Sequence, residues 1–197
     1  MTAETSAELG AERLRAAVLA LRAPQAAKRA PAPTSSVFGR AAAAVPLDAH
    51  QPTPRSQIAG RFSSVETSAL LPGTTMALIV LPTPGAPPPG LLRSCHLLVQ
   101  SGAVVVMLGP DMPRDVPSDR SRPLTLPLRA DDALAAEEAL IACGPARRIA
   151  FLARREPDSD NLWSWIVTRD AVAVHRAGTA ILERVPFLRL RIPALAS

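Results

Sequence analysis

Three aspartates in a short proline-containing stretch are the first residues that could do chemistry. Residues 109–119 read GPDMPRDVPSD and carry Asp111, Asp115 and Asp119. Oxygen ligands of this kind suit divalent cations, so a small enzyme that uses residues 109–122, with or without a metal, is one function to consider. The spacing matches no EF-hand, because the invariant glycine and the terminal glutamate are missing. A solvated acidic loop is the favoured interpretation, and the enzyme is kept as an alternative.

Other catalytic signatures are missing from the sequence. His50, His96 and His175 are widely separated, and no GxSxG nucleophile elbow occurs. The stretch PTPGAPPPG at 82–90 stands where a phosphate-binding loop would follow a first strand, but it lacks GxxxxGK[ST], and Lys28, the only lysine, lies far away. Prolines also remove the backbone donors that a phosphate needs. We therefore expect no catalytic site, no metal site and no bound cofactor.

Arginine and tryptophan gather in one polar stretch near the C-terminus. ARREPDSDNLWSWIVTR contains Arg154, Arg155, Trp163 and Trp165. These two residue types are over-represented among the anchors of protein interfaces, and the same pair could stack on unpaired bases. The alternative is that Trp163 and Trp165, two residues apart, share one face of a strand and pack under a helix. The pattern alone leaves both interpretations open.

A second candidate contact lies at the N-terminus. Residues 6–23 place Leu14, Val18 and Leu21 along one face of an amphipathic helix, which Pro24 ends. Such a helix can lay its apolar face in a groove of a partner protein. We expect residues 1–24 to form this helix and residues 25–64, rich in proline and arginine, to form a flexible linker that tethers it.

Charge and composition narrow the function classes. The net charge of +5 is uneven, with +4 in residues 1–65 and +1 in residues 66–197, so attraction to phosphate would come mainly from the N-terminal third. A single-stranded DNA-binding protein is thus another alternative, and a weak DNA contact is expected at most. Cys95 and Cys143 lie in apolar contexts on expected helices, as buried core residues of a reducing compartment. With no apolar run of about 18 residues, we expect a cytoplasmic protein without membrane contact.

The elements that must position these residues begin near Val65. Residues 63–75 suggest a short helix and a turn, and MALIVLP at 76–82 is typical of a buried strand. Residues 91–101 have helical spacing, with Gly102 suited to the C-terminal cap. AVVVML at 103–108 does not alternate, which indicates a central parallel strand buried on both faces. The loop that follows it would lie at the sheet edge where ligands bind in open α/β folds.

The sequence of the second half of the chain predicts a similar alternation of helices and strands. Residues 124–130 are consistent with either an edge strand or an extended approach to the next element, and Asp131 or Asp132 can cap a helix over 133–143. RRIAFLARR at 147–155 predicts a second buried strand, and the tail from Leu162 predicts two or three antiparallel strands. Residues 65–197 are therefore expected to form one α/β domain with a mainly parallel sheet and antiparallel C-terminal strands.

The order of these elements resembles the later part of the RecA core. The pattern of helix, SGAVVVML, polar loop, helix, RRIAFLARR and a tail beginning LWSWIVTRDAVAV is similar to that family, and SALLPGTTMALIVLP resembles the turn and first core strand. The chain departs from RecA by losing the nucleotide site, as do the RecA-like accessory proteins of the ImuA and SulA group. The resemblance implies a non-catalytic adaptor in damage-induced, error-prone DNA repair. Its implied partners are an inactive Y-family polymerase homologue and an error-prone polymerase.

Overall fold

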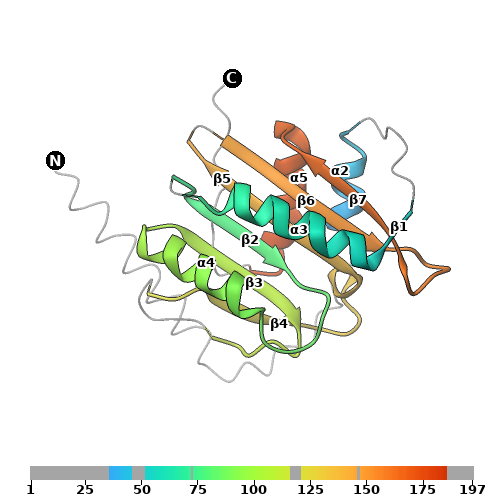
Figure 1. Cartoon of the computed structure of the whole chain (residues 1–197), viewed down its shortest axis with the longest axis horizontal. Coiled ribbons are helices and arrows are strands. Elements are labelled where there is room, and N and C mark those ends of the chain that lie inside the picture. Colours follow the sequence, from blue (N-terminus) through green and yellow to red (C-terminus); the bar gives the residue numbers. More distant parts are fainter. Residues whose placement is uncertain (1–35, 46–51, 72, 116–120, 146, 186–197) are drawn as a thin grey trace.

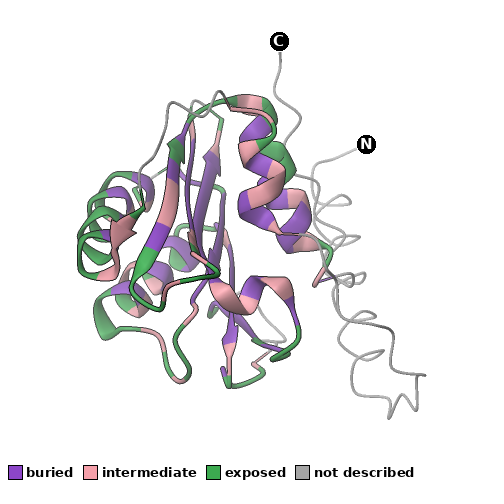
Figure 2. Cartoon of the chain, turned by 90° about the vertical axis from the view of Figure 1, so that its right-hand side faces the viewer, coloured by how far each residue is buried: buried purple, intermediate pink, exposed green. Residues whose placement is uncertain are grey.

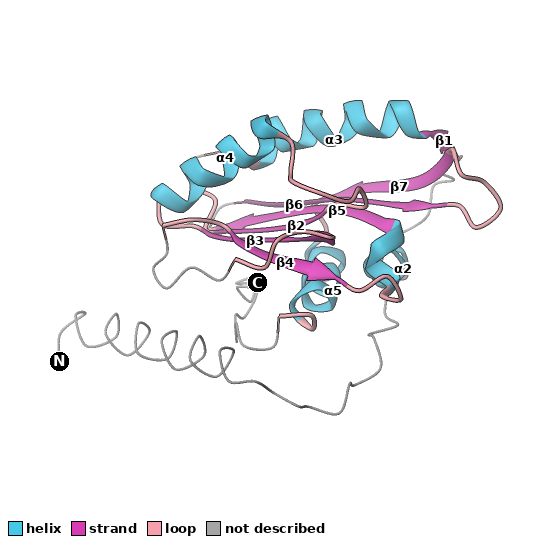
Figure 3. Cartoon of the chain, turned by 90° about the horizontal axis from the view of Figure 1, so that it is seen from below, coloured by secondary structure: helices cyan, strands magenta, loops and turns pink. Residues whose placement is uncertain are grey.

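One mixed β-sheet lies between two layers of helices. The structure is a computed structural model that describes residues 36–45, 52–71, 73–115, 121–145 and 147–185. Helices α3 (Arg55–Ala69) and α4 (Pro89–Gln100) cover one face of the sheet, and α2 (Val37–Ala42) and α5 (Ala171–Leu182) cover the other (Figure 3). The fold class is therefore α/β, as the sequence predicts.

The sheet has seven strands in the order β1-β7-β6-β5-β2-β3-β4 (Figure 1). Only the pairs β2–β3 and β3–β4 are parallel, and the other four pairs are antiparallel. The expectation of a mainly parallel sheet is therefore wrong. The strand bounds are β1 Thr53–Pro54, β2 Met76–Val80, β3 Val104–Pro110, β4 Leu124–Leu128, β5 Glu137–Gly144, β6 Arg147–Arg155 and β7 Leu162–Thr168.

The core lies on both faces of the central strands (Figure 2). All five residues of β2 are buried, because their side chains point alternately into two apolar clusters. Leu78 packs with α2 and α5, whereas Ile79 packs with α3 and α4. Phe62 of α3 meets Phe151 of β6 edge-on, with 5.6 Å between ring centroids. The unbroken apolar runs of the sequence thus reflect burial on both faces.

Several sequence predictions are confirmed. Residues 76–80 and 104–110 form parallel β2 and β3, and residues 124–128 form the edge strand β4. The helix expected at 91–101 is α4, and Gly102 after it has φ +90°, in the left-handed region that glycine adopts without strain. His96 lies within α4, where its Nδ1 is 2.8 Å from the carbonyl oxygen of Leu92.

The helix expected over 133–143 is wrong. Residues Ala133–Ala136 form a single 3-10 turn, η1, and β5 follows immediately. Alanine, glutamate and leucine favour helices intrinsically, but in this segment pairing with β2 and β6 buries seven residues on both faces of the sheet. Asp132 does act as a cap, accepting from the backbone N–H of Leu134 at 2.9 Å. Residues 147–155 are a strand, but they return antiparallel to β5 rather than after a crossover helix.

Part of the expected antiparallel tail is also helical. β7 confirms the first tail strand, and Ala171–Leu182 forms α5. AVAV resembles a strand, but the Asp170 carboxylate accepts from the backbone N–H of Ala173 at 2.8 Å and starts a helix. The buried residues Ala173, Val174, Ala177 and Ile181 then follow helical spacing and face the sheet.

The flexible linker expected at 25–64 is wrong for residues 36–45 and 52–64. These residues form α2, β1 and most of α3, so the α/β fold begins well before Val65. The signal was weak because α3 is rich in serine, and only Ile58, Phe62, Val65 and Ala69 carry its buried stripe. The N-terminal helix expected at 6–23 lies outside the described residues.

Both cysteines are buried and free. Cys95 lies on α4 as expected, but Cys143 lies on β5, so its placement on a helix is corrected. Burial raises the pKa of the Cys95 thiol to about 12, and nearby Glu66 adds to this effect. No helix in the described part of the chain is long and apolar enough to cross a membrane.

A buried ion pair ties the end of α5 to η1. Arg184 Nη2 lies 2.9 Å from Asp132 Oδ1, and each side chain is only 4% exposed. We expect Asp132→Ala to reduce the free energy of unfolding by about 3–5 kcal/mol, because it leaves the Arg184 charge buried without its carboxylate. Urea unfolding measures this loss. Asp131→Ala is the matched control, since Asp131 pairs with Arg129 at the exposed surface, where a pair contributes about 0–1 kcal/mol. Equal losses in both variants would contradict the assignment.

Candidate functional site

The structure brings the four predicted C-terminal contact residues onto neighbouring strands but divides them between two faces. In the β6–β7 ladder Arg155 is opposite Trp163, Ala153 is opposite Trp165, and Arg154 is opposite Ser164. Directly opposite residues share a face. Arg155 and both tryptophans therefore lie on the α3 side, and Arg154 lies on the α2 side. Leu14, Val18 and Leu21, the predicted N-terminal contacts, lie outside the described residues.

The tryptophans pack beneath α3. Trp163 is 5% exposed, and the guanidinium of Arg55 lies 4.8 Å from its ring centroid. The guanidinium of Arg61 lies 4.0 Å from the ring of Trp165. The interpretation that both rings share one strand face under a helix is therefore confirmed. Sequence reasoning missed the two arginines, because they fall in the stretch taken as a linker.

Trp165 also holds the first strand. Its indole Nε1–H donates to Thr53 Oγ1 at 3.1 Å. Arg55, which follows β1 directly, donates its backbone N–H to the carbonyl oxygen of Asn161 at 2.9 Å. The tryptophan pair thus connects β1, α3 and β7, and Trp163 has no open ring face on which a base could stack.

A buried carboxylate completes the contact between α3 and the sheet. Glu138 lies on β5 and is 5% exposed, and its Oε2 accepts from Arg55 Nη1 at 2.7 Å. Burial raises the pKa of Glu138, and the charge and hydrogen bond of Arg55 oppose that rise. Arg55 therefore serves two partners at once, the carboxylate and the Trp163 ring.

The neighbouring carboxylate holds the opposite helix layer. Glu137 is 2% exposed and accepts from the backbone N–H groups of Val37 at 2.9 Å and Phe38 at 3.2 Å, and from the Ser36 hydroxyl. An anion suits this place because the first N–H groups of a helix have no partner within it. Arg154 lies over the Phe38 ring at 5.0 Å. Successive residues of one strand thus anchor helices on opposite faces of the sheet.

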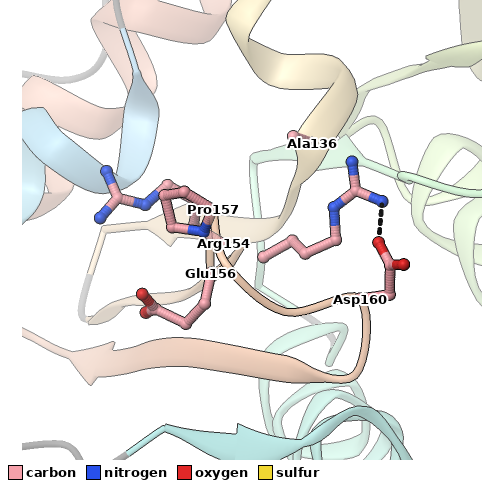
Figure 4. A pocket seen from close by; sticks show the side chains of 6 residues that line it. Ala136, Arg154, Glu156, Pro157 and Asp160 are labelled. Carbon is pink, nitrogen blue, oxygen red and sulfur yellow. Dashed lines mark ion pairs between the residues drawn. The ribbon is translucent and has the colours of Figure 1, made fainter.

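An open pocket of about 350 Å³ lies beside these anchors (Figure 4). It is lined by Ala136, Arg154, Arg155, Glu156, Pro157 and Asp160. Arg155 Nη1 is 3.5 Å from Asp160 Oδ1, and the Ser164 hydroxyl donates to Glu156. Arg154 and Arg155 are successive residues of β6, so their side chains start on opposite faces of the sheet and are not set to converge on one anion. The lining can make polar contacts to a partner, and one of its ion pairs, between Arg155 and Asp160, lies within it.

The carboxyl ends of the parallel strands carry the loops where an α/β fold would bind a ligand. Between β2 and α4 the loop is fixed at Leu81, whose N–H donates to Leu108 O at 2.9 Å, and at Gly85, whose N–H donates to Pro110 O at 3.3 Å. Pro88 is the N-cap residue of α4 and Pro89 its first residue, and no side chain caps this end. Proline has no backbone N–H, so the helix start offers fewer donors than a phosphate site requires.

The acidic loop after β3 is partly engaged in holding the sheet edge. Asp115 exchanges backbone hydrogen bonds with Thr125, and its carboxylate lies 3.2 Å from Arg122 Nη1. Asp111 is exposed, with φ +54°, and Asp119 lies outside the described residues. Within the part of the chain that is described, no three His, Cys, Asp or Glu side chains are grouped to hold a metal ion.

Comparison with known proteins adds no relative. No family model, curated protein or solved structure matches the chain.

Removal of Arg55 tests the contact between α3 and the sheet. We expect Arg55→Ala to lower the free energy of unfolding by about 2–3 kcal/mol, because Glu138 loses its charged partner in a buried position. Arg61→Ala is the matched control, since it removes only the ring contact with Trp165 and costs about 0.5–1 kcal/mol. Chemical denaturation followed by tryptophan fluorescence measures both. A loss for Arg61→Ala as large as that for Arg55→Ala would contradict the role of the ion pair.

The raised pKa of Glu137 leads us to expect a specific pH dependence of stability. Burial raises its pKa from 4.5, against the hydrogen bonds from Ser36, Phe38 and Val37 and the charge of Arg154. The folded chain then binds a proton more tightly than the unfolded chain, so this group's contribution to stability falls as pH rises from 4.5 through the folded pKa.

Glu137→Gln removes that titration. The free energy of unfolding of the variant should fall less steeply over this pH window than that of the natural chain, as urea titrations at several pH values would measure. Asp158→Asn in the exposed hairpin controls for the loss of one negative charge. Parallel curves for Glu137→Gln and the natural chain would refute the assignment.

Proposed function

We propose that this protein is a non-catalytic α/β adaptor with a reduced RecA-like core that recruits protein partners in damage-induced, error-prone DNA repair. The observation that carries the proposal is the connection from β2 to α4. This connection lies at the carboxyl end of a central parallel strand and is built from Pro82, Pro84 and Pro87 to Pro89. A nucleotide-binding version of the fold needs successive N–H donors at that place.

The engagement of the buried charges also supports an adaptor. Glu137 and Glu138 each hold a helix, and Arg184 holds Asp132. Charged groups with such roles stabilise a scaffold and are not poised for proton transfer, which needs a group within hydrogen-bond reach of a substrate. The scaffold proposed here works through contacts rather than chemistry.

The resemblance to the ImuA and SulA group supplies the biological setting. The proposed partners are an inactive Y-family polymerase homologue and an error-prone polymerase. The contact proposed for them is the N-terminal segment with Leu14, Val18 and Leu21, since an amphipathic helix can dock its apolar face in a groove. Residues 137–144 form a strand and residues 171–182 a helix, unlike the corresponding elements of the expected RecA-like order. The proposed setting therefore depends on the proline-rich connection after β2 and on the first core strands, β2 and β3.

A pull-down from damaged and undamaged cells tests the function. The full chain should recover polymerase-type partners after DNA damage, and a chain without residues 1–24 should not. Leu14→Ser with Val18→Ser should reproduce the loss, because these changes remove the apolar contact area. Arg15→Ser with Arg22→Ser, which lie off the apolar stripe of the helix expected from the sequence, is the matched control and should retain recovery.

Two outcomes would overturn the proposal. One is recovery of no polymerase-type partner in either condition. The other is tight, magnesium-dependent ATP binding with turnover by the purified chain, because the proposal rests on a core that has lost its nucleotide chemistry.

A further inference from the structure

Three arginines lie near one another at the end of the sheet where β2 and β3 begin. Arg148 is the second residue of β6, Arg169 directly follows β7, and Arg176 lies on α5. Ala150 of β6 is opposite Thr168 of β7, so the segments that carry Arg148 and Arg169 are neighbours (Figure 1). Arg176 is about 8 Å along the helix axis from the start of α5. We call these three residues the arginine patch.

The arginine patch has no carboxylate to neutralise it. Within the part of the chain that the structure describes, none of its three guanidinium groups forms an ion pair or a hydrogen bond. Asp170, the acidic residue next to Arg169, instead accepts from the backbone N–H of Ala173 and caps α5. Arg169 and Arg176 are exposed, so their charges face solvent.

Arg148 is held in place by partial burial. Its Nη1 is buried and has no hydrogen-bond partner among the described residues. Cys143, directly opposite on β5, belongs to the apolar cluster under α2 and α5, so Arg148 starts on that face of the sheet. A buried donor without a partner and a cation without an opposite charge both cost free energy. An anion at the exposed edge of this guanidinium would supply the missing charge.

The arginines at the opposite end of the sheet are paired. The described ion pairs at that end are Arg55 with Glu138, Arg129 with Asp131, Arg155 with Asp160 and Arg184 with Asp132. Residues 66–197 carry a net charge of only +1, yet the fold separates these pairs from the arginine patch by the length of the sheet. Near-neutral composition therefore coexists with a local positive field that attracts polyanions.

We propose that the arginine patch binds the phosphate backbone of a nucleic acid. A guanidinium presents parallel N–H donors that match phosphate oxygens, and three of them on separate segments suit a ligand that repeats its charge. A protein partner is more often anchored by apolar or aromatic side chains in a pocket, and the pocket of Figure 4 lies at the opposite end of the sheet. Phosphate contacts carry no sequence information, so the binding is independent of base sequence.

This inference goes beyond the proposed adaptor function and does not depend on the identity of its protein partners. Charge counting places attraction to phosphate mainly in the N-terminal third of the chain, whereas the arginine patch belongs to the folded α/β domain. An adaptor with such a patch would hold its partners on a nucleic acid.

Fluorescence anisotropy with the full chain tests the inference, using labelled oligothymidylate and a labelled DNA duplex of mixed sequence as probes. Arg169→Ala with Arg176→Ala should weaken binding about tenfold at low salt. It should also reduce the slope of log K against log salt by about 1.8 for the duplex and about 1.4 for the single strand, because two phosphate contacts are lost. Arg148→Gln should weaken binding in the same direction.

The matched control is Arg129→Ala with Arg155→Ala, which removes the same charge from two exposed, ion-paired arginines at the opposite end. It should leave the affinity and the salt slope almost unchanged. Val172→Ser, which removes a 51% exposed apolar side chain from the first turn of α5, should also leave them unchanged. Thermal melts establish that each variant is folded.

Each outcome decides the inference. Binding of either probe that falls in the patch variant and is kept in the control supports it, and the preferred probe identifies the form of nucleic acid. Absence of binding to both probes at low salt overturns it, as does an equal loss in the patch variant and the control. A loss confined to Arg15→Ser with Arg22→Ser also overturns it, because the N-terminal segment would then be the contact.

Poly-L-glutamate separates a nucleic acid from an acidic protein. Displacement of the probe by poly-L-glutamate at an equal concentration of charges, or a loss of binding in Val172→Ser, would assign the patch to an acidic protein segment and overturn the inference. The damage-dependent pull-down is independent of these titrations. Failure to recover polymerase-type partners alongside patch-dependent DNA binding would remove the adaptor function and leave the nucleic-acid contact standing.

Discussion

Strand β5 is the constraint on which the rest of the structure depends. It is the one described strand that pairs with the parallel half of the sheet through β2 and with the antiparallel half through β6. Seven of its eight residues are buried, and at its first two positions carboxylates point to opposite faces. Glu137 binds the start of α2, and Glu138 binds Arg55 at the start of α3. The pleat of a single strand thus fixes the position of both helix layers.

That arrangement explains why buried charges occur in a small scaffold. A buried carboxylate destabilises a fold unless hydrogen bonds and an opposite charge compensate for its desolvation. Here the partners come from segments about 80 and 100 residues away in the sequence. The contacts therefore connect the beginning of the described chain to its centre, and Trp163 and Trp165 extend the connection to β7. The buried polar groups at this end of the sheet hold the helices in position.

The carboxyl ends of the parallel strands carry exposed loops rather than buried ion pairs. There the connection after β2 is rigid and exposed, and its prolines leave few backbone donors. The proposed function follows from this shortage of backbone donors. A fold can keep its helix and sheet layers while the loops at its ligand-binding edge change in function. The reason is that the scaffold positions these loops, which contribute little to its core.

The sequence by itself determined the α/β class, the strands β2, β3, β6 and β7, and helix α4, because apolar patterns and a cap glycine are local signals. It left residues 124–128 open between an edge strand and an extended segment. For Trp163 and Trp165 the sequence left two interpretations open, and packing on one strand face under a helix was one of them. It did not determine that 137–144 is a strand, that 171–182 is a helix, or that Arg55 and Arg61 cover the tryptophans. Those features were decided by the tertiary structure. The pairing of β5 on both sides overrides the helical preference of its residues, and ion pairs between distant segments have no signature in local spacing.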